Sequence, residues 1–149
     1  DAEVQAALAA VLEVVDPDAD LDLAVLGVLD RVGQQVAKHL PQAQRIHAFF
    51  APQDVAVIGL HTVFEHHAAM TPVSLQAFLH EYRIAFPVGV DAPSADARQP
   101  IPLTMQAYAL QGTPSLVLID RKGHLRRHAF GGEDDLLLGA AIATLVDEG

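Results

Sequence analysis

The sequence has no cysteine among its 149 residues. Disulfide bonds, thiolate metal sites and catalysis by a thiol are therefore excluded for this chain. Basic residues are also scarce, because 9 Lys and Arg side chains stand against 19 Asp and Glu side chains and leave a formal net charge of -10. Binding to nucleic acid or to anionic lipid needs clustered positive charge. We therefore expect neither a nucleic acid nor a membrane as partner.

Long apolar runs and a basic N-terminus are missing as well. No apolar run approaches the ~18 residues of a membrane span, and Asp1 to Val4 lack the basic start of a signal peptide. Hydrophobic residues still make up 51% of the chain, which is enough for a globular core. We expect a soluble, cytoplasmic protein with one domain over residues 1–149 and no cofactor, and the sequence leaves its oligomeric state open.

The first part of the chain is rich in alanine and leucine. Apolar residues recur at helical spacing from Val4 to Val15, which predicts a helix, and with its linker this helix occupies residues 1–20. The main body of the domain then covers residues 21–149. It begins with an apolar run from Leu21 to Leu29, which predicts a buried strand, with a short helix as the alternative.

The rest of the chain alternates between helical patterns and short apolar runs, which is typical of an α/β domain. A helical pattern from Val36 to Phe50 contains Pro41, which is expected to kink or divide the helix. The remaining predicted elements are a strand at 55–60, a helix from Thr71-Pro72, an extended segment at 84–91, a loop at 92–102, a strand at 116–119, a return strand at 125–130 and a final helix after Glu133.

A turn and a hairpin organise the C-terminal third of the chain. Gly112-Thr113-Pro114 precedes the all-apolar strand Leu116 to Ile119, and Asp120 to Gly123 forms the hairpin turn that follows. We expect Val57, Ile58 and the residues of this strand to lie almost fully buried in adjacent central strands.

Together these segments resemble the thioredoxin-like redoxin family, and within it the branch of TlpA-like and alkyl hydroperoxide reductase/thiol-specific antioxidant proteins. The residues that carry the resemblance are Val55 to Leu60, Phe86 to Asp91, Tyr108 to Pro114, Leu116 to Gly123 and Phe130-Gly131. The resemblance implies a thioredoxin-like α/β fold, in which helices flank a central mixed sheet and a cis-proline precedes a C-terminal β-hairpin and a final helix. It also implies that the Thr113–Pro114 peptide bond is cis.

The sequence departs from this family at the redox site. The family's Cys-x-x-Cys position falls at about Val32-Gly33-Gln34-Gln35, and none of these side chains forms a thiolate. No catalytic residue carries over, whereas Gly112, Thr113 and Pro114 match the residues that line the family's peptide groove. We therefore expect a redox-inactive protein that binds a peptide or protein partner at this groove. The alternative is an active oxidoreductase that an altered or incomplete sequence represents, so enzyme activity is undecided.

A histidine-rich segment after the strand at 55–60 suggests a second alternative. His61, Glu65, His66 and His67 stand where ligands bind in open α/β sheets, and imidazole and carboxylate groups are metal ligands. Their spacing matches no established ligand motif, and polar loop residues are the default interpretation. The metal site is therefore a hypothesis that the position of these side chains in the fold can test.

Overall fold

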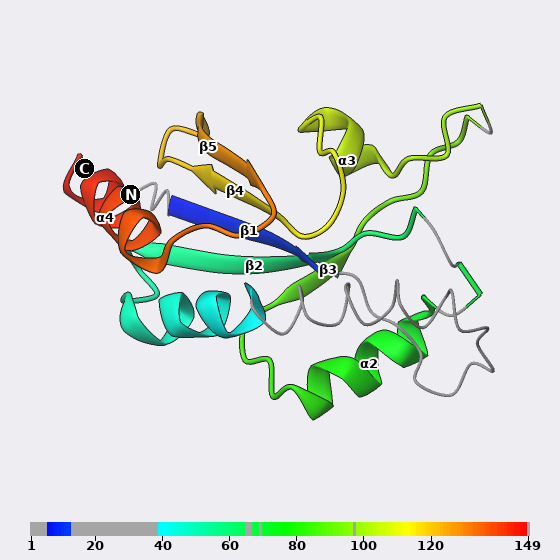
Figure 1. Ribbon diagram of the computed structural model, residues 1–149, viewed down its shortest axis with the longest axis horizontal. Coiled ribbons are helices and arrows are strands. Elements are labelled where there is room, and N and C mark those ends of the chain that lie inside the picture. The colour runs from blue at the N-terminus through cyan, green and yellow to red at the C-terminus, as the bar shows by residue number, and fades with distance from the viewer. Residues whose placement is uncertain (1–5, 13–38, 65–66, 69, 97, 149) are drawn as a thin grey trace.

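The computed structural model describes residues 6–12, 39–64, 67–68, 70–96 and 98–148 (Figure 1). Its strands are β1 (Ala6–Leu12), β2 (Val55–His61), β3 (Val88–Val90), β4 (Ser115–Ile119) and β5 (Leu125–Phe130). Its helices are the helix through residues 39–49, α2 (Pro72–Glu81), α3 (Leu103–Ala107) and α4 (Asp135–Asp147). No helix in these described ranges is long and apolar enough to cross a membrane.

The five strands form one mixed sheet in the order β3-β2-β1-β4-β5. The strands β1, β2 and β3 run parallel, whereas β4 is antiparallel to both β1 and β5. This arrangement confirms the expected α/β fold with a central mixed sheet, a C-terminal hairpin and a final helix. It also places β1 at the centre of the sheet, between β2 and β4.

The expectation of an N-terminal helix is wrong, because Ala6–Leu12 forms the strand β1. Its backbone pairs with β2 from Ala6↔Val55 to Leu12↔His61 and with β4 from Ala7↔Ile119 to Val11↔Ser115. Pairing on both sides satisfies the backbone of the strand, and this tertiary gain outweighs an alanine helix propensity worth less than about 1 kcal/mol per residue. The predicted strand at Leu21 to Leu29 lies outside the described residues.

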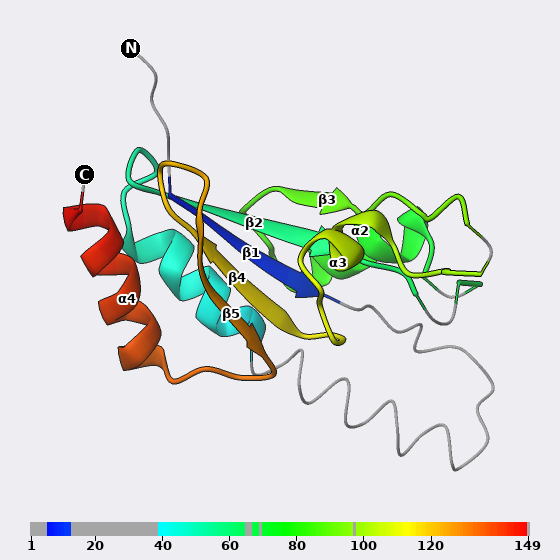
Figure 2. The same ribbon diagram turned by 90° about the horizontal axis from the view of Figure 1, so that it is seen from above.

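The main core lies between one face of the sheet and the helices 39–49 and α4, which run along that face (Figure 2). Its buried residues are Leu40, Ala43, Ile46, Val55, Val57, Phe86, Leu116, Leu118, Leu138, Ile142 and Leu145. A smaller cluster on the other face joins Met105, Leu110 and Val117 under α3. The two clusters together explain why four consecutive residues of β4, from Ser115 to Leu118, are buried.

Three details of the predicted core need correction. Ile119, at the end of β4 beside the hairpin turn, is half-buried rather than almost fully buried. Ile58 is 40% exposed rather than almost fully buried, because it faces away from the main core while its neighbours Val55 and Val57 point into it. In addition, β2 and β4 are not adjacent, since β1 separates them. The apolar run of β2 is therefore buried mainly on one face.

The helices follow their sequence signals closely. Thr71 caps α2, because its side chain accepts a hydrogen bond from the Ser74 amide and the Ser74 side chain accepts one from the Thr71 amide. Asp134 caps α4 by accepting hydrogen bonds from the first amides of that helix. The helical residues 39–49 continue past Pro41, so the expected division of this helix is not found there.

Candidate functional site

Three strand ends meet at one edge of the sheet. Leu12, the last residue of β1, pairs with His61 at the end of β2, and Val11 pairs with Ser115 at the start of β4. Neighbouring strands lie about 4.8 Å apart, so the end of β2 and the start of β4 are about 10 Å apart across β1. The chain leaves β1 between these two ends. We call this border of the sheet the carboxyl edge, because it holds the carboxyl ends of its parallel strands.

The Gly112-Thr113-Pro114 turn lies at the carboxyl edge directly before β4. The Thr113–Pro114 peptide bond is cis, the form that the sequence analysis expects. Ser115 holds the turn in place, because its buried hydroxyl donates a hydrogen bond of 2.7 Å to the Gly112 carbonyl oxygen. Thr113 and Pro114 are half-buried, so part of each remains accessible to a partner.

Phe130, at the end of β5, lies beside this turn. It pairs with Ser115 across the hairpin, and a β-carbon at position 112 would lie 3.0 Å from Phe130 Cε2. Glycine at 112 therefore lets the aromatic ring approach the backbone. The ring remains 55% exposed, so an accessible apolar side chain stands next to Thr113 and Pro114. We call the surface of these four residues, Gly112, Thr113, Pro114 and Phe130, the proline groove, after the family's peptide groove that the sequence predicts at Gly112-Thr113-Pro114.

Gly131, which follows Phe130, also holds the proline groove in place. The Gly131 amide donates a hydrogen bond of 2.9 Å to the Pro114 carbonyl oxygen. Gly131 adopts φ +81°, which an L side chain rarely takes, so glycine suits this turn. The groove is therefore fixed by two hydrogen bonds within the hairpin, one from Ser115 and one from Gly131.

The predicted redox position cannot be placed against this groove. Val32, Gly33, Gln34 and Gln35 lie outside the described residues. The described helix 39–49 packs on the same face as α4 through its buried residues. Its sequence contains no thiol, and neither does any other part of the chain.

His61 is buried at the carboxyl edge, with 1% of its surface exposed. Neither ring nitrogen has a hydrogen-bond partner among the described residues. Burial lowers the pKa of the imidazole below its ordinary value of 6.5, because the charged form loses its hydration. A neutral imidazole is the form that this position favours.

The predicted metal site is not assembled from the residues that the structure describes. His61 is buried and His67 is exposed, while Glu65 and His66 lie outside the described residues. Across the described ranges, no three His, Asp or Glu side chains come together in a way that could hold a metal ion. The metal hypothesis therefore stays a prediction that rests on His61 and on residues not described.

Asp91, which was not among the predicted site residues, is a buried carboxylate at the same edge of the sheet. Its side chain accepts hydrogen bonds from the Thr62 hydroxyl at 3.3 Å and from the amides of Thr104 at 3.0 Å and Met105 at 3.3 Å. Its own amide donates to the His61 carbonyl oxygen at 2.9 Å. These bonds join the ends of β2 and β3 to α3, so Asp91 holds the edge together.

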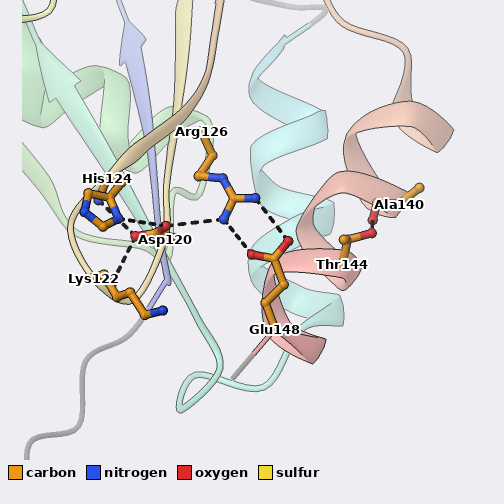
Figure 3. A network of polar contacts seen from close by, with 7 residues as sticks. All are labelled: Asp120, Lys122, His124, Arg126, Ala140, Thr144 and Glu148. Atoms are coloured by element: carbon orange, nitrogen blue, oxygen red, sulfur yellow. Dashed lines mark hydrogen bonds and ion pairs between the residues drawn. The ribbon is translucent and has the colours of Figure 1, made fainter.

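A second polar cluster occupies the opposite end of the hairpin (Figure 3). Arg126 donates to both carboxylate oxygens of Glu148, at 2.6 and 3.0 Å, and to Asp120 at 3.3 Å. The pKa of Asp120 falls to about 2, chiefly because the His124 amide hydrogen-bonds its carboxylate, with help from the Lys122 amide and Arg126. A cavity of about 310 Å³ borders this cluster. The cluster ties the end of α4 to β5 and lies away from the proline groove.

The fold and the groove define a class of protein. A mixed sheet in this strand order, with a cis-proline before the strand of a C-terminal hairpin and a helix after it, is the thioredoxin-like fold. No family model matches the sequence, and a search of curated proteins gives no match. Solved structures provide the comparison that decides the family.

The thioredoxin-like superfamily protein SPOA0173 is 47% identical to this chain, with a TM-score of 0.80, and the match covers 99% of this chain and 83% of that one. A thiol-disulfide isomerase from Corynebacterium glutamicum is 39% identical, with a TM-score of 0.80, and the match covers 98% and 83% of the two chains. The chain therefore belongs to the thioredoxin-like superfamily. StoA from Bacillus subtilis is 15% identical over 92% of this chain and 81% of its own, with a TM-score of 0.60, which shows the shared fold alone.

Proposed function

We propose that this protein is a binding module of the TlpA-like and alkyl hydroperoxide reductase/thiol-specific antioxidant branch of the superfamily. It binds an extended segment of a peptide or protein at the proline groove and carries out no thiol–disulfide exchange. The observation that supports this proposal is how the residues of the proline groove are exposed and held in place. Thr113 and Pro114 are half-buried beside the exposed ring of Phe130, and hydrogen bonds from Ser115 and Gly131 hold them in place.

The groove offers two kinds of contact to a partner. The backbone of the Gly112-Thr113-Pro114 segment can form hydrogen bonds with an extended peptide. Phe130, which is 55% exposed, offers an apolar surface for a side chain of that peptide. The net charge of -10 favours a neutral or basic partner over an acidic one. An unfolded basic chain is therefore a suitable probe.

The lack of a thiol supports binding without redox chemistry. Thiol–disulfide exchange begins with a thiolate, and the sequence contains no cysteine that could form one. The protein is therefore expected not to catalyse the reduction of insulin disulfides by a reductant that keeps thioredoxin in its reduced form. Insulin reduction above a heat-treated control would contradict this, provided that the mass of the protein matches the sequence.

A specific observation favours the alternative of an active oxidoreductase. The Corynebacterium glutamicum relative, at 39% identity over 98% of this chain, is a thiol-disulfide isomerase. The alternative requires a cysteine at about Val32 to Gln35 in the natural protein. Complete peptide mapping by mass spectrometry of protein from its native source separates the two proposals, because a cysteine-bearing peptide at this position supports the enzyme.

Binding is tested with reduced ribonuclease A whose thiols are blocked by iodoacetamide, a permanently unfolded and basic chain. The labelled probe is titrated with the protein, and fluorescence anisotropy gives the dissociation constant. Phe130→Ala is compared with Leu125→Ala, because both residues lie on β5 and are similarly exposed, at 55% and 49%, but Leu125 lies at the far end of the strand.

The proposal predicts saturable binding that Phe130→Ala weakens roughly 5- to 30-fold, or about 1–2 kcal/mol, as expected for the loss of an apolar anchor. Leu125→Ala should leave the affinity within a factor of two. An equal effect of both substitutions would show that the probe binds non-specifically, and an unaltered affinity of Phe130→Ala would place the binding surface elsewhere.

A further inference from the structure

A partly buried ion pair lies near the proline groove, because Arg127 is on the same strand as Phe130. Arg127 Nε donates a hydrogen bond of 2.8 Å to Glu133 Oε1 and lies 2.7 Å from Oε2. The Glu133 side chain is only 13% exposed, and that of Arg127 is 39% exposed. A carboxylate so poorly hydrated depends on its cation, because removal of one partner leaves an uncompensated charge.

This ion pair closes a short turn. Arg127 lies on β5 and Glu133 lies two residues before α4, so the pair spans the Gly131-Gly132 segment that leaves the strand. The backbone of Glu133 is held as well, because Gln42 Nε2 donates to its carbonyl oxygen at 3.0 Å. The end of the turn is therefore anchored both to the sheet and to the helix 39–49.

The turn also packs tightly against that helix. A β-carbon at position 132 would lie 2.6 Å from His39 Cε1, so the imidazole ring lies directly against the Gly132 backbone. Glycine at this position allows this approach, because a side chain here would require the His39 ring to move. The turn is therefore confined by Arg127 on one side and by His39 and Gln42 on the other.

The confined turn contacts the groove directly. Its first residue, Gly131, donates the 2.9 Å hydrogen bond to the Pro114 carbonyl oxygen. The position of Gly131 thus depends on Glu133, two residues further on, and the position of Pro114 depends on Gly131. The ion pair is thus connected to the groove by the backbone from Glu133 back to Gly131 and by the hydrogen bond from Gly131 to Pro114.

We propose that the Arg127–Glu133 ion pair is a positioning element, which holds the Gly131-Gly132 turn against Pro114 and so sets the affinity of the proline groove for an extended peptide. The affinity part of this inference rests on the proposed binding function. The positioning part concerns the Gly131 hydrogen bond alone and can be measured without any ligand.

The neighbouring residue on β5 provides a matched control. Arg126 forms an ion pair with Glu148, with side-chain exposures of 37% and 47%. This second pair joins the same strand to the same helix, but at the C-terminal end of α4 (Figure 3). Removal of either pair costs stability, whereas only the Arg127–Glu133 pair adjoins the turn that contacts Pro114.

The first arm of the experiment measures amide hydrogen exchange by NMR in the wild type and in Arg127→Gln, Glu133→Gln and Arg126→Gln. The rate at Gly131 is compared with that at Leu118 in the buried strand β4, because a general loss of stability accelerates both. We expect Arg127→Gln and Glu133→Gln to accelerate exchange at Gly131 by at least about ten-fold relative to Leu118. Arg126→Gln should leave this ratio within a factor of two.

Two further variants guard against a failure to fold. Arg127→Lys keeps the cation and should retain most of the protection at Gly131. The double variant Arg127→Gln/Glu133→Gln removes both charges and leaves no unpaired buried carboxylate, so it should fold even if Arg127→Gln does not. Positioning by the ion pair is refuted if the ratio of the two rates is unaltered in the folded variants among Arg127→Gln, Glu133→Gln and the double variant, or if Arg126→Gln changes it equally.

The second arm measures the affinity for the blocked, unfolded ribonuclease A. Arg127→Gln should weaken binding roughly 3- to 30-fold, the usual range for a residue that acts through others, and Arg127→Lys should restore most of it. If the wild type does not bind the probe while Gly131 exchange responds as expected, the binding function fails and the positioning role stands. If binding weakens without any change at Gly131, the positioning role fails and the groove stands.

Discussion

The burial difference between two large apolar residues gives a quantitative test of the fold. Leu118 lies on β4 and is 1% exposed, whereas Ile58 lies on β2 and is 40% exposed. Replacement by alanine removes three carbon atoms from either residue. At about 0.8 kcal/mol for each buried methylene, the transfer contribution for a fully buried side chain is about 2.4 kcal/mol.

The two substitutions should differ because only one of them leaves a closed cavity. Leu118 belongs to the main core between the sheet and the helices, so a cavity contribution is added and the total reaches roughly 3–5 kcal/mol. Ile58 keeps part of its surface in water, which reduces the transfer contribution to roughly 1.4 kcal/mol, and solvent can fill the space. The expected difference between the two variants is roughly 1.6–3.6 kcal/mol.

Urea denaturation followed by circular dichroism measures both free energies of unfolding. The comparison requires that both variants unfold with the slope of the wild type, since a changed slope would indicate a changed unfolded state. Similar losses for the two variants, or a loss below about 1 kcal/mol for Leu118→Ala, would show that the sheet does not present these faces as described.

Three further predictions concern single residues. Asp120→Asn should lose stability relative to the wild type above about pH 4, and the difference should vanish as the pH falls toward 2, because the His124 amide and other donors depress the pKa of Asp120 in the folded state to about 2. The free energy of unfolding of the wild type should fall below pH 6.5, because His61 binds a proton in the unfolded state while burial lowers its pKa in the folded state. His61→Leu should remove this fall, which for one proton is at most about 1.4 kcal/mol per pH unit and is measured by thermal or urea unfolding. Gly59→Ala should cost about 1–3 kcal/mol in urea unfolding, because its β-carbon would lie 2.8 Å from a methyl carbon on β3, whereas Gly89→Ala meets its nearest neighbour at 3.8 Å and should be milder.

The C-terminal half of the fold could be predicted because its signals are local. The hairpin turn at Asp120 to Gly123 joins the two strands, as the sequence predicts. Counting outward from the turn would pair Ser115 with Ala129, but an irregularity between Leu118 and Ile119 shifts the register by one residue and places Phe130 opposite Ser115. The position of Phe130 therefore could not be read from the turn alone. The cap at Thr71 is also a local signal and is confirmed, whereas the cap at Asp134 is a finding of the structure.

The error at β1 has a physical cause. A strand that pairs on both sides and lies at the centre of a sheet shows no alternation of apolar and polar residues, so its sequence can match a helical pattern equally well. Ala6–Leu12 has this character, and alanine and leucine favour a helix when nothing else decides. Pairing with β2 and β4 decides the outcome, and both partners are more than 40 residues away in the sequence.

Of the candidate site, too, only a part could be predicted from the sequence. Gly112, Thr113 and Pro114 could be predicted because three adjacent residues carry the turn, and the structure brings them together at the carboxyl edge. Asp91 could not be recognised, because its role depends on amides of α3 that begin 13 residues later. The Arg127–Glu133 pair depends on how the Gly131-Gly132 turn folds back, which residue types alone do not specify.

The contacts around Pro114 are formed in a thioredoxin-like chain that has no thiol. Ser115 and Gly131 hold the Gly112-Thr113-Pro114 turn from within the hairpin, and Phe130 packs against Gly112. None of these contacts involves the position where the family carries its cysteines. In the proposed function, the absence of a thiol removes the redox chemistry and leaves the hydrogen bonds of Ser115 and Gly131 in place, so binding at this edge would not require redox activity.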